Sequence, residues 1–136
     1  MNTTACLPSP AVPAGPFPAE VETIIAALES RPRPLVERHR LPRRRHRVLA
    51  SLYLYSRHGS PPAELFTRHV NAKGLGFLVD GLLPVGHGAT VVLVDFEGQL
   101  RSIRCTILRC GLVASGWYEG ACYFNREQMC FAHSAP

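Results

Sequence analysis

The fold of this chain is decided by residues 43–79, RRRHRVLASLYLYSRHGSPPAELFTRHVNAKGLGFLV. Within it, residues 48–55, 64–71 and 75–79 are rich in β-branched, aromatic and other apolar side chains. The segments between them contain Gly, Pro and Ser, which are common in turns. Short apolar runs between turn residues are typical of β-strands, so we expect three consecutive strands here.

The strand pattern continues toward the C-terminus. Residues 90–96 and 99–110 flank Glu97 and Gly98, and we expect them to form a hairpin. In the second arm, every other residue from 103 to 107 is apolar, as in a strand with one buried face. Residues 117–124 read as a sixth strand.

The chain is therefore expected to be mainly β, because six short strands separated by turns indicate a barrel or a sandwich. Residues 125–132 are expected to add a short helical turn that is capped by Asn125.

On the N-terminal side, residues 19–30 predict an amphipathic helix. Its apolar residues fall at the spacing i, i+3, i+4, i+7, and they are Val21, Ile24, Ile25 and Leu28. A helix of about three turns must dock on something to persist. Residues 31–46 follow as an arginine-rich connector, and like-charge repulsion is expected to keep it mobile. The expected parts of the chain are a disordered Pro/Ala-rich leader (1–18), the helix and basic connector (19–39), a β-barrel domain (40–126) and a C-terminal tail (127–136).

The positive charge of the chain is concentrated in one segment. Between Arg31 and Arg47, eight arginines and one acid, Glu37, give a charge of +7. Seven basic and nine acidic residues elsewhere leave −2, for a net charge of +5. A local concentration of this kind favours one anion-binding site over a generally basic, nucleic-acid-binding surface.

Several function classes are not expected. The chain has five cysteines, an odd number without a CxxC pair, which argues against a disulfide framework and against a zinc site. No recognisable set of nucleophile, base and orienting group indicates an enzyme. No apolar run is long enough to cross a membrane, and residues 1–18 lack the pattern of a secretory signal, so we expect a cytoplasmic protein.

Two motifs carry a family resemblance. Arg43 and Arg47 form an RxxxR motif before the first strand, and His69, Asn71 and Gly74 form HxNxxG after the second. Their order and spacing resemble the PilZ family, whose motifs are RxxxR and (D/N)xSxxG at these places. The resemblance covers about residues 40–126, and it departs from the family at His69 and Asn71.

This resemblance implies a six-stranded antiparallel barrel that binds cyclic di-GMP without catalysis, cofactor or metal. The implied ligand-binding residues are Arg43, Arg44, Arg47, His69, Asn71 and Gly74. Arginine suits such a ligand because its planar guanidinium pairs with phosphate and stacks on purines. A downstream protein partner is expected, whereas membrane insertion and nucleic-acid binding are not.

Two other functions remain open from the sequence. The chain could be a degenerate member of the family that acts as a protein-interaction adaptor, or a basic nucleic-acid-binding barrel. His69 and Asn71 have a structural interpretation as well, as polar residues that satisfy the backbone of a turn. Trp117 is interpreted as a core or rim residue of the barrel rather than as a platform for the ligand.

Overall fold

The computed structural model describes residues 17–30 and 43–132. Its elements in chain order are α1 (Ala19–Glu29), β1 (Arg44–Arg45), β2 (Leu49–Leu54), the 3-10 turn η3 (Tyr55–Arg57), β3 (Ala63–Asn71), β4 (Gly74–Val79), β5 (Gly88–Val94), β6 (Leu100–Ala114), β7 (Trp117–Phe124) and the 3-10 turn η4 (Met129–Phe131). Most of the expected leader and connector, residues 1–16 and 31–42, lie outside the described part of the chain. In that part, no helix is long and apolar enough to cross a membrane.

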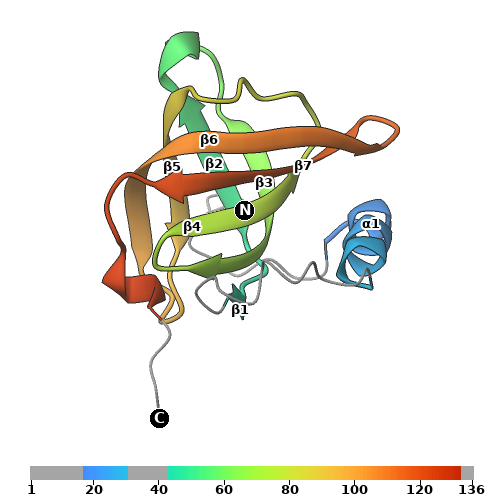
Figure 1. Ribbon diagram of the computed structural model, residues 1–136, viewed down its shortest axis with the longest axis horizontal. Coiled ribbons are helices and arrows are strands. Elements are labelled where there is room, and N and C mark those ends of the chain that lie inside the picture. Colours follow the sequence, from blue (N-terminus) through green and yellow to red (C-terminus); the bar gives the residue numbers. More distant parts are fainter. Residues whose placement is uncertain (1–16, 31–42, 133–136) are drawn as a thin grey trace, which may run out of the picture.

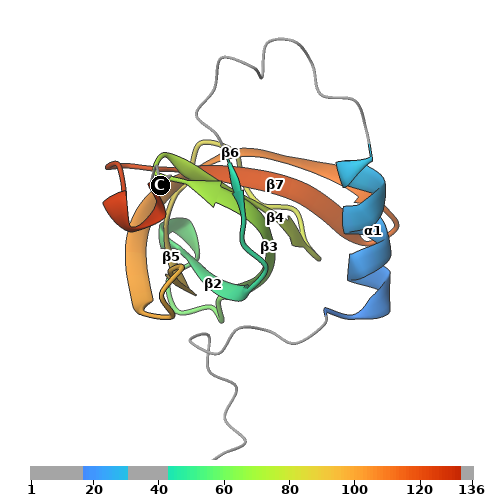
Figure 2. The same ribbon diagram turned by 90° about the horizontal axis from the view of Figure 1, so that it is seen from below.

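Six strands close into an antiparallel barrel, as Figures 1 and 2 show. The hydrogen-bonded order is β3-β2-β5-β6-β7-β4, and β4 pairs again with β3. This closed barrel confirms the expected architecture at the level of a mainly β, six-stranded fold. The short strand β1 was not expected. It pairs with the end of β3 next to β2, so it continues the line of β2 along the same side of β3.

The barrel core follows the alternation read from the sequence. In β6, Ile103, Cys105 and Ile107 are buried, and the residues between them face outward. The expected hairpin between β5 and β6 is also present, and Gly98 takes a positive φ of 83° in its turn. Since only glycine adopts this conformation without strain, the turn is well matched to its sequence.

Phe131 closes one end of the barrel core. Its ring is buried and lies 5.7 Å from the ring of His46, 5.4 Å from Phe96 and 6.0 Å from Phe124, measured between centroids. The core therefore extends beyond residue 126. The expected helical turn is present only as η4, and the expected cap is wrong. Gln128 precedes η4, while the side chain of Asn125 accepts a hydrogen bond from Thr106 at 3.0 Å.

Helix α1 lies outside the barrel, beside β7 and the tip of the β6–β7 hairpin (Figures 1 and 2). Val21 and Ile25 are fully buried against Phe66 and Leu78, which point outward from β3 and β4. Trp117 packs at the edge of the same cluster, with its ring centroid 5.7 Å from that of Phe66. The predicted helix and its need for a docking surface are thereby confirmed.

Candidate functional site

A pocket of about 390 Å³ opens where β1 begins beside the end of β3, at the β3–β4 turn. Four of the six residues proposed from the sequence line it: Arg43, His69, Asn71 and Gly74. The other lining residues are Lys73, Leu75, Gly76, Leu108, Arg109, Ala121 and Tyr123. The register of β3, β4 and β7 brings these side chains together from distant parts of the chain.

Arg43 and His69 meet in this pocket. Arg43 Nη1 lies 3.3 Å from His69 Nε2, and a guanidinium can only donate, so Nε2 accepts and the imidazole is neutral. Burial, together with the charges of Arg43 and Arg68, lowers the pKa of His69 to about 3. The ring packs closely against Gly76, where an added Cβ would come within 2.5 Å of Cε1. His69 is therefore a fixed, uncharged wall of the pocket.

Asn71 and Gly74 have structural roles in the β3–β4 turn. Asn71 Oδ1 accepts hydrogen bonds from the backbone N–H groups of Lys73 at 2.8 Å and Gly74 at 3.1 Å. A Cβ on Gly74 would come within 2.6 Å of the carbonyl oxygen of Cys122 on β7. The interpretation of Asn71 as a residue that satisfies turn backbone is thus confirmed, and Gly74 is required by the close approach of two strands.

Arg44 and Arg47 do not line the pocket. The guanidinium of Arg44 lies over the ring of Phe96, 4.0 Å from its centroid. Arg47 Nη2 donates to Glu22 Oε1 on α1, and its guanidinium lies 4.7 Å from the centroid of Phe17. This hydrogen bond lowers the pKa of Glu22. The side chain of Arg47 is only 17% exposed, so it is packed against α1 and is not an open cation at the surface.

The expectation of a mobile connector is also wrong for its last three residues, which are hydrogen-bonded to the barrel. Arg44 and Arg45 pair with Val70 and His69 on β3, and the N–H of His46 donates to the carbonyl of Arg68 at 3.0 Å. Backbone hydrogen bonding to a closed barrel opposes the repulsion between neighbouring arginines. The rest of the connector, residues 31–42, lies outside the described part of the chain.

Three polar side chains that line the pocket were not among the residues proposed from the sequence: Lys73, Arg109 and Tyr123. Arg109 reaches the pocket from β6 and forms two hydrogen bonds to Glu119, at 3.1 and 2.7 Å. Glu119 is also paired with Arg68 at 3.3 Å. Tyr123 is 45% exposed and lines the pocket. Arg109 and Tyr123 belong to no motif, so only the register between β6 and β7 shows that they share the pocket.

The pocket has the chemistry of an anion site. Its described lining contains the cations Arg43, Lys73 and Arg109, and no acidic side chain is among those residues. The neutral imidazole of His69 and the ring of Tyr123 add surfaces that suit a planar group. Over residues 17–30 and 43–132, no group of three His, Cys, Asp or Glu side chains could hold a metal ion.

Comparison of the chain with protein-family models and with curated proteins gives no match.

Proposed function

We propose that this chain is a non-catalytic receptor for cyclic di-GMP and that the pocket beside the β3–β4 turn is its binding site. The observation that supports this function is the gathering of Arg43, Lys73 and Arg109 around an opening that also carries the ring of Tyr123. A ligand with two phosphates and two purines needs both cations and aromatic surfaces. The resemblance of the two motifs to the PilZ family points to the same ligand.

The three cations of the pocket have different roles in binding. Arg43 stands at the edge of β1, where its guanidinium can pair with a phosphate or with the acceptor edge of guanine. Lys73 is exposed on the turn and suits a phosphate as a point charge. Arg109 is held by Glu119 and still exposes 42% of its side chain, so its position is set before the ligand arrives. Such preorganisation reduces the entropic cost of binding.

Binding at Arg43 provides a route to a downstream partner. Arg43 and Arg47 belong to one short segment, and Arg47 holds Glu22 of α1. A ligand that pulls Arg43 toward the pocket shifts this segment and thereby alters the docking of α1 on the barrel. The signal is then the changed position of α1, and the partner is a protein that recognises this change.

A second function, a protein-interaction adaptor without nucleotide, is favoured by a different observation. Asn71, Gly74 and Arg47 all have structural roles in the free protein. These motif residues would therefore be needed for folding even if no ligand were bound. The nucleic-acid alternative finds less support, since several described cations outside the pocket are engaged within the chain: Arg44 with Phe96, Arg47 with Glu22 and Arg101 with Asp95.

Isothermal titration calorimetry of the full chain with cyclic di-GMP tests the proposal. We expect Arg43→Ala and Arg109→Ala each to weaken binding about tenfold or more, since one charge-assisted hydrogen bond contributes about 1.5–3 kcal/mol. Arg126→Ala is the matched control, because Arg126 is exposed and does not line the pocket.

Three outcomes contradict this proposal. If the parent protein gives no heat and no thermal stabilisation with cyclic di-GMP, the adaptor is favoured. If Arg43→Ala and Arg109→Ala both bind as the parent does, the ligand binds elsewhere and the assignment of the pocket is wrong. If random oligonucleotides bind more tightly, with affinity that falls steeply as salt rises, the nucleic-acid function is favoured.

A further inference from the structure

A second pocket lies at the other end of the β3–β4 hairpin. It measures about 310 Å³ and is formed by the end of β2, η3, the turn after η3 and the loop that follows β4. Strand β3 begins here at Ala63 and ends at Asn71 in the first pocket, and β4 begins at Gly74 and returns here at Val79. The two pockets are therefore separate sites that share one hairpin.

The floor of this pocket is apolar and its rim carries interface-type side chains. Leu52, Leu54 and Leu83 are buried residues of the barrel core that also line it. Tyr53 is 47% exposed and Leu82 is 60% exposed at the rim. Tyrosine and arginine are enriched in the energetically important parts of protein interfaces, whereas lysine and glutamate are depleted. The described lining has two tyrosines and one arginine, and its one acidic residue is Asp80.

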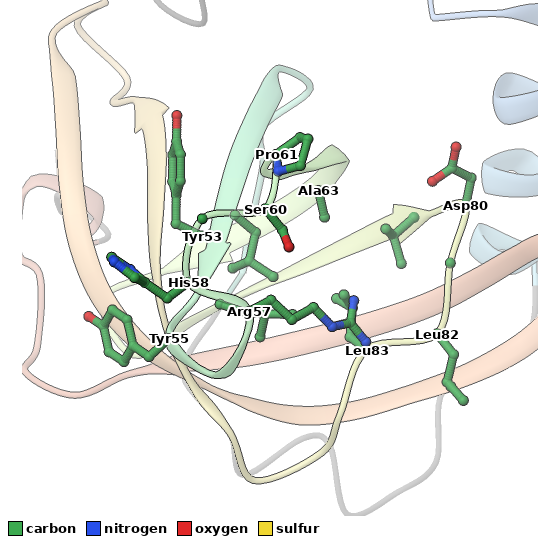
Figure 3. Close-up of a pocket in the computed structure, with 15 residues that line it drawn as sticks. Tyr53, Tyr55, Arg57, His58, Ser60, Pro61, Ala63, Asp80, Leu82 and Leu83 are labelled. Carbon is green, nitrogen blue, oxygen red and sulfur yellow. The ribbon is translucent and has the colours of Figure 1, made fainter.

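Arg57 is the cation of this pocket. Figure 3 shows its side chain extending across the opening toward Leu83, while the carboxylate of Asp80 points away from it. In residues 17–30 and 43–132, no carboxylate forms an ion pair with Arg57. The charge that Arg57 presents to an occupant is thus positive and is not neutralised by a described neighbour.

The backbone and the rim are held in place without a ligand. The N–H of Ser60 donates to the carbonyl of Arg57 at 3.0 Å, and Gly59 has a positive φ of 88° in the same turn. The hydroxyl of Tyr55 lies 2.7 Å from that of Thr90. A preformed rim lowers the cost of ordering a surface when a partner binds.

We propose that this pocket docks a segment of a partner protein in which an apolar side chain stands next to a carboxylate. The apolar side chain would fill the floor above Leu54 and Leu83, and the carboxylate would pair with Arg57. Apolar surface continues from the floor onto the exposed rim, where Leu82 is 60% exposed and Tyr53 is 47% exposed, so a small molecule that filled the pocket would leave much of it uncovered. This extent favours a protein segment as the occupant. The proposal is independent of nucleotide binding.

Selection from a phage library of random dodecapeptides against the immobilised full chain tests this site. We expect enrichment of peptides with Leu, Ile or Phe adjacent to Asp or Glu. Arg57→Glu should reduce the binding of the selected peptides about tenfold or more, because it places a carboxylate opposite their own. The control Arg126→Glu makes the same change of charge outside the pocket and should bind as the parent does.

The location is read from the amide chemical shifts of the full chain with one selected peptide. They should change in residues 53–63 and 79–83 and stay constant near His69 and Tyr123. The thermal midpoints of the two glutamate variants show whether both are folded. Absence of enrichment, a basic consensus, or peptides that bind the Arg57 variant as tightly as the parent each overturn the proposal.

Discussion

Replacing Ile25 with alanine should release α1 from the barrel while the barrel remains folded. Ile25 is 1% exposed and lies between Val21 and the outward-facing Phe66 and Leu78. Removing a buried isoleucine to this extent costs about 2–5 kcal/mol. This corresponds to an increase in the opening of α1 between about thirtyfold and a few thousandfold. The undocked helix would unfold, because 11 residues are too few for a stable isolated helix.

Hydrogen exchange measured by mass spectrometry or NMR follows both parts of the molecule at once. The exchange protection of the α1 amides should fall by about thirtyfold to a few thousandfold. The protection of the β5 amides should change little, because the barrel closes through backbone pairing that does not involve α1. Thr23→Ala is the matched control, since Thr23 is exposed on the same helix and alanine is the better helix former. If β5 loses protection as much as α1 does, the two form one cooperative unit and the reasoning is refuted. If α1 is unchanged, the packing of Ile25 does not hold it.

Two further predictions concern His69. Burial lowers its pKa to about 3, so below the ordinary value near 6.5 the unfolded state binds a proton that the folded state does not, and stability should fall by up to about 1.4 kcal/mol per pH unit. Urea unfolding at pH 7.5 and 5.5 should show a smaller fall in His69→Gln, and an equal fall in both proteins would contradict this origin. In the second prediction, His69→Asp combined with Asn71→Ser gives the chain the (D/N)xSxxG pattern of the PilZ family, and calorimetry should show tighter binding of cyclic di-GMP. Weaker binding would indicate that His69 makes a contact of its own with the ligand.

The strands could be predicted because their causes are local. Side chains in β6 alternate between core and surface, and Gly98 marks a turn that few other residues could form. The length of β6 was not predicted, since the strand continues past residue 110 to Ala114 in a hairpin that extends toward α1. The apolar stripe of α1 predicted a docking face, but not the surface on which it docks.

The candidate site could be predicted only in part, because motif spacing does not determine the direction of a side chain. Arg43 and His69 were placed together correctly by the order of the two motifs. Arg47 turns toward Glu22, which lies far from it in the sequence and is brought near only by the docking of α1. Arg109 reaches the pocket across a register shift in the β6–β7 pairing between Ile107 and Arg109, which no local pattern reveals.

Phe131 also has a consequence for the order of events during synthesis on the ribosome. Its partner His46 lies near the start of the barrel sequence, so the contact between Phe131 and His46 connects the two ends of the domain in sequence. Folds with many such distant pairings fold slowly. Almost the whole domain must therefore leave the ribosome before Phe131 can pack into this end of the barrel. Until then Phe96 and Phe124 lack their common neighbour, which makes this end of the unfinished barrel a candidate for recognition by chaperones.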